Sequence, residues 1–316
     1  MAYRGMLVAA GFGTRLVPLT HELPKPAVPV GNRPIAAFAL EALASAGIRD
    51  VVVNTHHLSA ELERALSPWC PEGVELRYVQ EPVILGTGGG VRNAWAARGG
   101  PLANEDFVVF NAKLVFAPNI GHALAQHRAS GAIASMVLRP LPIDSSFAAV
   151  EHDESGRIRR IRGLPSASVA PIGLTRAMFT GVQILSSRAF NDLPLDGDMI
   201  EGAYLRWLAS GEHVQAIFDD SPWVDVGVTV AHYLQANLAL ARSEIRWPGI
   251  EPDPKGNIID PSVKLPYGVQ LDHVVLGRDV HVPECAELSR VVAWPGAHLP
   301  MRLSNAVVTS DSVIAR

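Results

Sequence analysis

The feature that most constrains the fold is a regular alternation of strand and helix patterns, which starts at an apolar run ended by a glycine. That run, Met6–Ala10, has no polar alternation, as is typical of a parallel strand buried on both faces. Further short apolar runs follow, with segments of helical periodicity between them. The expected strands are 51–54, 76–80, 107–111 and 132–138, and the expected helices are 35–46, 90–97 and 120–130.

This alternation predicts an α/β fold, a mainly parallel mixed sheet with helices on both faces in a Rossmann-like arrangement. Between 148 and 185 short strands and turns replace the pattern, which indicates an inserted antiparallel layer. A helix near 199–210, a strand at 214–218 and a helix at 230–241 are expected to complete the domain. Ligands of such sheets bind beyond the carboxyl ends of the strands, so we expect the functional residues there.

The end of the sequence has a different periodicity. Aliphatic residues recur about every sixth position, without helical spacing and with turn residues between them. This period predicts a short C-terminal left-handed parallel β-helix of hexapeptide repeats, and an irregular β appendage is the alternative. We therefore expect an α/β domain at 1–245 and a linker with the β-helix at 246–316. The recurring residues are Val263, Val269, Val275, Val282 and Leu288.

Composition excludes several classes of function. The 316 residues are 48% hydrophobic and 18% charged, which is enough for one large domain and a small one. A formal net charge of −4 offers no basic field, so neither nucleic acid nor a membrane is expected as a partner. The two cysteines, Cys70 and Cys285, form neither a disulfide framework nor a zinc cluster. With no long apolar segment, we expect a soluble cytoplasmic protein.

The most informative motif is the glycine loop after the first strand, G-F-G-T-R at 11–15, with P-K-P at 24–26. Glycines allow the backbone to approach a phosphate closely, and their N–H groups can point at it. The guanidinium of Arg15 suits phosphate oxygens, and Lys25 between two prolines offers a fixed positive charge. A dinucleotide fingerprint is disfavoured because Leu16 stands where its third glycine belongs. An ordinary turn is the other alternative.

The run G-F-G-T-R-L-V-P-L-T with its P-K-P resembles the nucleotide-binding loop of the sugar nucleotidyltransferases. In that family a sugar 1-phosphate attacks the α-phosphorus of a nucleoside triphosphate, and pyrophosphate leaves. The resemblance implies that Arg15 neutralises the pyrophosphate and that Lys25 binds phosphates near the reacting centre, both as catalytic residues. The implied nucleotide-binding residues of the loop are Ala9, Gly11, Gly13 and Thr14.

The resemblance extends over about 240 residues. Q-E-P at 80–82 and L-G-T-G-G at 85–89 are similar to the family's base-recognition strand and covering turn, which implies nucleotide contacts by Gln80, Gly86 and Thr87. W-V-D-V-G at 223–227 is similar to the closing turn whose aspartate, here Asp225, is catalytic and binds Mg²⁺. F-T-G-V at 179–182 resembles the strand whose glycine, Gly181, admits the sugar. The core resembles N-acetylmuramate-1-phosphate uridylyltransferase, and the tail resembles that of mannose-1-phosphate guanylyltransferases.

Two departures from the family pattern bear on catalysis. Where relatives end a strand with N-G-D, this chain has Asn111-Ala112-Lys113, so Asn111 is kept for the nucleotide but one of two metal-binding aspartates is missing. Where many relatives carry a sugar-binding E-K-P, it has R-G-L-P at 162–165. The charge of a protonated Lys113 equals that of aspartate plus Mg²⁺, so Lys113 is a candidate catalytic residue and the need for Mg²⁺ is in question.

Two functions therefore stay open at this point. One is an enzyme that makes a nucleotide-sugar from a nucleoside triphosphate and a sugar 1-phosphate. The other is a catalytically weak or silent subunit that binds a nucleotide-sugar and supports an active paralogue. The tail, which leaves an exposed end, favours a homo-oligomer in either case.

Overall fold

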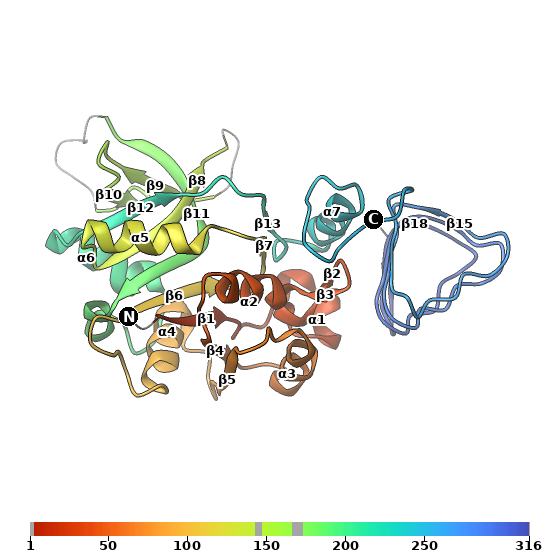
Figure 1. The fold of residues 1–316 in the computed structure, drawn as a ribbon, viewed down its shortest axis with the longest axis horizontal. Helices are drawn as coiled ribbons and strands as arrows, with labels where there is room; N and C mark the ends of the chain where they lie inside the picture. Colours follow the sequence, from red (N-terminus) through yellow and green to blue (C-terminus); the bar gives the residue numbers. More distant parts are fainter. Residues whose placement is uncertain (1–2, 143–146, 166–172, 316) are drawn as a thin grey trace. The chain divides into compact units, whose positions relative to one another are not determined.

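The structure is a computed structural model whose described residues form two compact units (Figure 1). The first unit holds the large sheet, and the second combines a short early segment with the end of the chain. The described residues are 3–142, 147–165 and 173–315. The units are Met1–Phe12 with Ala36–Trp223, and Gly13–Ile35 with Val224–Arg316.

The sheet of the first unit mixes parallel and antiparallel strands in the order β10-β9-β11-β6-β1-β4-β5, with β8 paired to β11 and β12 paired to β8. Strands β6, β1, β4 and β5 are parallel, whereas β11 runs antiparallel to β6, β8 and β9. The strands are β1 (Tyr3–Val8), β4 (Asp50–Thr55), β5 (Glu75–Gln80), β6 (Asp106–Asn111), β8 (Ala134–Pro140), β9 (Ala149–His152), β10 (Ile158–Ile161), β11 (Thr175–Ser186) and β12 (Val214–Phe218). The expected mixed α/β sheet and its antiparallel insertion are confirmed.

Helices cover both faces of this sheet. Met6 and its register partners Val52 and Val109 are fully buried on the face where helix α4 packs. The opposite face carries Gly5, whose missing Cβ would lie 3.0 Å from Leu43 of helix α2. The first unit's helices are α2 (Ile35–Ser45), α3 (Ser59–Leu66), η3 (Ser67–Trp69), α4 (Gly86–Ala96), α5 (Ile120–Ser130), η4 (Ser187–Asp192), η5 (Ile200–Tyr204) and α6 (Leu205–Ser210), and β7 (Leu114–Phe116) follows β6.

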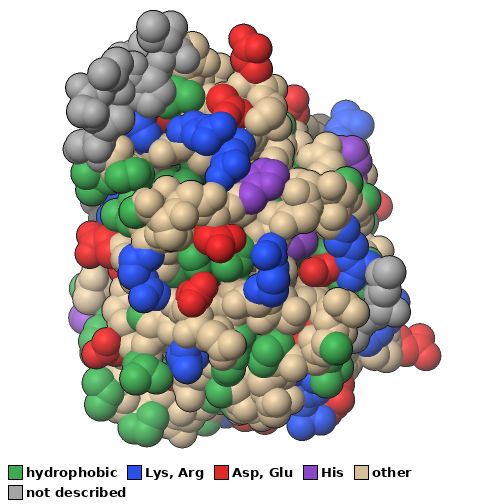
Figure 2. Space-filling model, turned by 90° about the vertical axis from the view of Figure 1, so that its left-hand side faces the viewer, with side chains coloured by type: hydrophobic (Ala, Val, Ile, Leu, Met, Phe, Trp, Pro, Cys, Tyr) green, Lys and Arg blue, Asp and Glu red, His purple; other side chains and the backbone are tan. Residues whose placement is uncertain are grey.

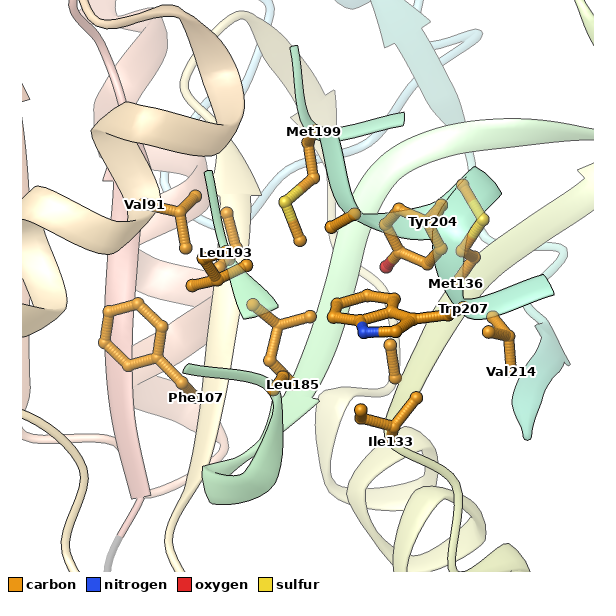
Figure 3. Close-up of a cluster of buried hydrophobic side chains, with 14 of the residues drawn as sticks. Val91, Phe107, Ile133, Met136, Leu185, Leu193, Met199, Tyr204, Trp207 and Val214 are labelled. Carbon is orange, nitrogen blue, oxygen red and sulfur yellow. The ribbon is translucent and has the colours of Figure 1, made fainter. Parts of the chain in front are cut away.

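A large buried cluster joins α4 and α6 to the sheet (Figure 3). The ring of Trp95 stacks on Phe107 with centroids 4.6 Å apart, and Trp207 meets Tyr204 edge-on. The buried hydroxyl of Tyr204 donates to Oε1 of Gln183 at 2.6 Å, so its polar atom has a partner. The cluster makes this unit a rigid support for the strand ends.

The buried histidine of α5 makes the stability of this unit pH-dependent. Burial lowers the pKa of His127 from 6.5 to about 4, and Nδ1 shares a 2.7 Å hydrogen bond with Ser135. As the pH falls from 6.5 to 4, the unfolded chain binds this proton before the folded chain does. Stability is therefore complete above pH 6.5 and falls by roughly 3 kcal/mol on acidification to pH 4.

We expect His127→Gln to reduce the loss of unfolding free energy between pH 7 and pH 4.5, measured by urea titration. The control is His122→Gln, because His122 is exposed on the same helix. An equal loss in wild type and His127→Gln would contradict the assignment.

The second unit contains a sheet of mainly parallel strands, drawn in blue in Figure 1. Strand β17 pairs in parallel with β15, β16 and β18, and β19 closes the sheet antiparallel to β18. The elements are η1 (Thr14–Leu16), α1 (Leu19–Glu22), η2 (Lys25–Ala27), β2 (Pro29–Val30), β3 (Arg33–Pro34), α7 (Val230–Ala241), β14 (Ile258–Ile259), β15 (Gln270–Asp272), β16 (Val275–Leu276), β17 (Glu287–Ala293), β18 (Arg302–Val308) and β19 (Val313–Ala315). Strand β13 (Trp223–Asp225) lies along the chain where the units join.

The six-residue spacing holds in this sheet only in part. Val282 and Leu288 belong to its buried apolar cluster, and Val263 and Val269 pack against that cluster. Val275 is buried but lies outside the cluster, whose members at this point are its neighbours Val274 and Leu276. Successive side chains of a strand face opposite ways, so Val275 is on the other face. The six-residue period therefore does not bring all five recurring residues to one face of this sheet.

The early segment 13–35 is held by the C-terminal part of the chain. The backbone N–H of Gly31 donates to Oδ1 of Asn237 at 2.9 Å, and Nδ2 of Asn32 donates to the carbonyl of Leu276 at 2.8 Å. The hydroxyl of Tyr233 donates to the carbonyl of Pro29 at 2.6 Å. The described residues thus place the phosphate-loop segment and the second sheet in one compact unit. The domain boundary expected near 245 stays a prediction.

No helix in the described part of the chain is both long and apolar enough to cross a membrane. On the face drawn in Figure 2, the acidic and basic side chains of the described residues are interspersed. That face therefore shows no extended basic field of the kind that binds nucleic acid.

Candidate active site

Four parallel strands end at the same edge of the first sheet and bring predicted residues together. Val8 is in register with Asn54 on one side and with Asn111 on the other. Thr55 is in register with Gln80, whose side chain is exposed. The start of the glycine loop, Gln80 and Asn111 therefore share this edge, as the position of ligands in such sheets predicts.

The backbone after β1 is held by hydrogen bonds at Ala9 and leaves open space beside Gly11. The N–H of Ala9 donates to Oδ1 of Asn54 at 2.7 Å, and the N–H of Gly11 donates to the carbonyl of Ala9 at 3.1 Å. A Cβ placed on Gly11 would meet nothing within 4 Å. A ligand can therefore approach this glycine closely. The ring of Phe12 is 55% exposed beside it.

The rest of the loop lies in the second unit, where Gly13 is the residue that requires glycine. Its φ is +67°, and a Cβ there would lie 2.8 Å from Thr20 and 3.2 Å from Cβ of Lys25. Gly13 thus allows the loop and Lys25 to approach each other. The side chains of Thr14 and Arg15 are exposed, as phosphate ligands must be.

The same segment argues against a dinucleotide fingerprint. Leu16 is fully buried, and the helix that contains it, η1, is three residues long. A dinucleotide motif needs a glycine there and a longer helix whose N-terminus faces the pyrophosphate.

The glycine-rich turn begins α4 four residues earlier than expected, at Gly86. Gly86 has φ +73°, and a Cβ would lie 2.5 Å from the carbonyl oxygen of Gly197; one on Gly89 would lie 2.6 Å from that of Leu195. The hydroxyl of Thr87 donates to Asp198 at 3.2 Å and accepts from the N–H of Met199 at 2.8 Å. These glycines allow close packing against 194–199, and the nucleotide contacts of Gly86 and Thr87 stay predictions.

The end of β6 brings Asn111 and Gly181 together. Gly181 has φ +98°, and a Cβ there would lie 2.9 Å from Nδ2 of Asn111. Strand β11 shifts register between Phe179 and Gln183, which places the glycine at an irregular point of the ladder. Lys113 lies two residues after Asn111, and its N–H donates to the carbonyl of Asn111 at 2.8 Å.

The donor set offers limited support for a metal. Asp225 is 7% exposed, and its Oδ1 accepts a 2.9 Å hydrogen bond from the N–H of Gly227. Among the described residues, no group of three or more His, Cys, Asp and Glu side chains could hold an ion. Mg²⁺ commonly takes one or two carboxylates with substrate phosphates and water, so a single carboxylate is the lower limit of a fit.

The segment that departs from the family's sugar-binding motif is occupied by its own contacts. Nη2 of Arg160 donates to the carbonyl of Gly163 at 2.7 Å, and Arg162 lies 3.8 Å from Glu201. The described residues here therefore form a turn stabilised by arginines, with no lysine.

Two buried polar residues beneath the strand edge, Asn54 and Glu81, were not predicted from the sequence, and each is 1% exposed. The available signals were an asparagine that ends an otherwise apolar strand and a glutamate directly after Gln80.

The sheet, the open glycine loop and the polar strand ends define an α/β protein with its candidate ligand edge at the carboxyl ends of the parallel strands. The family model described as nucleotidyl transferase matches residues 4–243, and the chain belongs to this family.

Curated relatives give the same assignment. The chain is 30% identical over 271 residues to a UTP–glucose-1-phosphate uridylyltransferase from Synechocystis sp., covering 79% of this chain and 67% of the relative. It is 26% identical over 304 residues to a mannose-1-phosphate guanylyltransferase from Mycobacterium tuberculosis, covering 93% and 80%. A Bacillus anthracis protein solved with sucrose shares the fold, with a TM-score of 0.62 at 21% identity over 79% of this chain and 98% of that one.

Proposed function

We propose that this chain transfers a nucleotidyl group from a nucleoside triphosphate to a sugar 1-phosphate. A phosphate oxygen of the sugar 1-phosphate bonds to the α-phosphorus, the bond from that phosphorus to the β-phosphate bridge breaks, and pyrophosphate leaves. The observation that carries the proposal is the shared edge at which the glycine loop, Gln80 and Asn111 lie. The relatives do not favour a silent nucleotide-sugar-binding subunit.

The roles of the individual residues are those that the family resemblance implies. The backbone of Ala9 and Gly11, and Gly13 with Thr14, would bind the phosphates. Arg15 would neutralise the leaving pyrophosphate, and Lys25 would hold the phosphates near the reacting centre. The amide of Gln80 would bind the base, Asn111 the nucleotide, and Gly181 would admit the sugar. The open space at Gly11 and the exposure of Arg15 support these assignments.

The family generally uses a divalent metal such as Mg²⁺. Bound here, it would supply positive charge at phosphate oxygens, and Asp225 would hold it. Lys113 follows β6, where we propose that its ammonium group faces the phosphates.

The test is pyrophosphate release from the full chain, with and without Mg²⁺. The panel combines UTP, dTTP and GTP with glucose 1-phosphate and mannose 1-phosphate. It is chosen because the relatives' names are those of uridylyl- and guanylyltransferases and, for a protein from Streptomyces antibioticus, of a glucose-1-phosphate thymidylyltransferase. Turnover with one pair supports the transferase. If the chain binds a triphosphate tightly but turns over none of the substrate pairs, the silent subunit is favoured instead.

We expect Arg15→Ala to weaken binding of the accepted triphosphate by about 1.5–3 kcal/mol, the range for hydrogen bonds to charged groups. Isothermal titration calorimetry measures this loss, and Arg246→Ala, another exposed arginine of the second unit, is the control. Equal affinity in Arg15→Ala and wild type would contradict the assignment.

The parallel pairings of the tail support a short left-handed β-helix. Val275 pairs with Ile258 and Val292, each 17 residues away, and Val292 pairs with Val307, 15 residues on. We expect the full chain to sediment as a homo-oligomer, because this sheet leaves an end exposed. Sedimentation as a monomer over the micromolar range would contradict this expectation.

A further inference from the structure

A buried carboxylate lies beneath the proposed nucleotide edge without a described role. Glu81 directly follows β5, and its side chain is buried together with that of Asn54 at the end of β4. Burial of a carboxylate costs several kcal/mol unless hydrogen bonds replace its water. The surroundings of Glu81 must therefore provide those hydrogen bonds.

Both carboxylate oxygens accept hydrogen bonds from the protein. Nδ2 of Asn54 donates to Oε1 of Glu81 at 2.7 Å, and the N–H of Leu85 donates to Oε2 at 3.0 Å. Both neighbouring groups donate hydrogen bonds to the carboxyl group, and neither accepts one from it. This arrangement suits the ionised carboxylate, which can only accept hydrogen bonds. Among the described residues, no ion pair to Glu81 is formed, so these neutral donors stabilise it.

The other end of Asn54 holds the glycine loop. Its Oδ1 accepts from the N–H of Ala9 at 2.7 Å and from that of Ala10 at 3.4 Å. These donors determine the amide orientation, because an NH₂ group could not accept from them. The pair thus connects the chain after β1 to the turn before α4.

Helix α4 covers the pair. A Cβ on Gly90 would lie 2.8 Å from Nδ2 of Asn54 and 2.9 Å from Oε1 of Glu81. Only a glycine allows this contact, which excludes water from the hydrogen bonds. A dry, fully bonded polar pair favours one local arrangement over alternatives.

We propose that Asn54 and Glu81 are positioning residues for the nucleoside half of the site, an inference that rests on the proposed function. They keep the Ala9–Ala10 backbone and the Leu85–Gly86 turn at a constant separation. Gln80 precedes Glu81 and its side chain is exposed, so the anchored glutamate also orients the residue proposed to bind the base. Affinity for triphosphate, and discrimination between bases, depend on this pair although neither residue touches the ligand.

Three variants test the pair. Glu81→Gln replaces one acceptor by a donor and leaves an N–H unpaired, and Asn54→Asp brings two carboxylates together. The double variant Asn54→Asp with Glu81→Gln restores every hydrogen bond, because the new aspartate accepts from Ala9 and from the new amide, whose oxygen accepts from Leu85. It also keeps the net charge of the wild type. Glu75→Gln is the control, because Glu75 is exposed at the start of β5, the strand that Glu81 follows.

Triphosphate affinity and its ratio between UTP, dTTP and GTP are measured well below each variant's unfolding temperature. We expect each single variant to bind triphosphate at least about tenfold more weakly and to discriminate less between the three bases. The double variant should recover most of the affinity and most of the discrimination. If the folded single variants bind triphosphate with the affinity of the wild type and with the same ratio between UTP, dTTP and GTP, the proposal is overturned.

Hydrogen exchange of the protein without ligand separates this proposal from the proposed function. Amides at 9–11 and 84–87 should exchange faster in the single variants, and return to wild-type rates in the double variant. Unchanged exchange in the single variants would overturn the positioning role. Failure of the wild type to bind any triphosphate would contradict the proposed function, while exchange would still show whether the pair holds the two segments.

Discussion

Lys113→Asp is expected to make turnover depend on Mg²⁺ and to raise it by about 10²–10³-fold, the range for a well-placed electrostatic contribution to a transition state. The family resemblance places an aspartate at this position, so the new carboxylate restores a metal ligand that the family pattern carries there. A lysine supplies charge but cannot ligate an ion that bridges phosphate oxygens. The measurement is pyrophosphate release over a Mg²⁺ titration, using the best substrate pair of the wild type.

The control is Lys113→Ala, which removes the positive charge without adding a ligand and should gain no Mg²⁺ dependence. Brisk Mg²⁺-dependent turnover by the wild type, with no gain in Lys113→Asp, would show that Lys113 does not replace a metal ligand. If Lys113→Asp binds Mg²⁺ and triphosphate but stays inactive, the defect lies in sugar binding. Gly163 and Leu164 stand there in place of the family's motif.

Elements with strong local periodicity were predictable from the sequence. Helix α5, strand β12 and helix α7 have the expected bounds, because apolar spacing and flanking signals agree in each. Helix α4 begins four residues early because contact with Gly197 and Leu195 outweighs the low helix propensity of glycine. That contact lies about a hundred residues away in the sequence and has no local signal.

The positions in the candidate site that could be predicted are those where the backbone conformation or a close contact requires a particular residue type. Gly13 and Gly181 both have positive φ, and both lie close to another predicted site residue, as close-approach glycines should. Asn54 and Glu81 were missed because their importance comes from burial, which an isolated polar residue in a sequence does not reveal. Val275 lies apart from the other recurring residues because the turns of the second sheet are 17 and 15 residues long, so a six-residue count does not stay in phase.

A second large effect is expected from removal of the C-terminal sheet. The phosphate-loop segment 13–35 belongs to the unit that contains the C-terminal sheet. Nε1 of Trp294 donates to the hydroxyl of Tyr233 at 2.8 Å, and that hydroxyl donates to Pro29. Glu22 bonds the hydroxyls of Thr309 and Ser310 near the end of the chain. These contacts stabilise the segment that carries Arg15 and Lys25.

Deletion of residues 248–316 is therefore expected to abolish triphosphate binding, although the proposed ligands lie before residue 248. The deletion removes the hydrogen-bond partners of Asn32, Glu22 and Tyr233, and each buried group left unpaired costs about 1–3 kcal/mol, a large part of the 5–15 kcal/mol that stabilises a typical domain. Calorimetry measures the binding, and hydrogen exchange should show loss of protection at 13–35 while β1 and β6 keep theirs. Trp294→Phe, which removes one donor and keeps an aromatic ring, should lose only a small part of the affinity. A deletion protein that binds triphosphate with wild-type affinity would show that the segment folds without the C-terminal sheet.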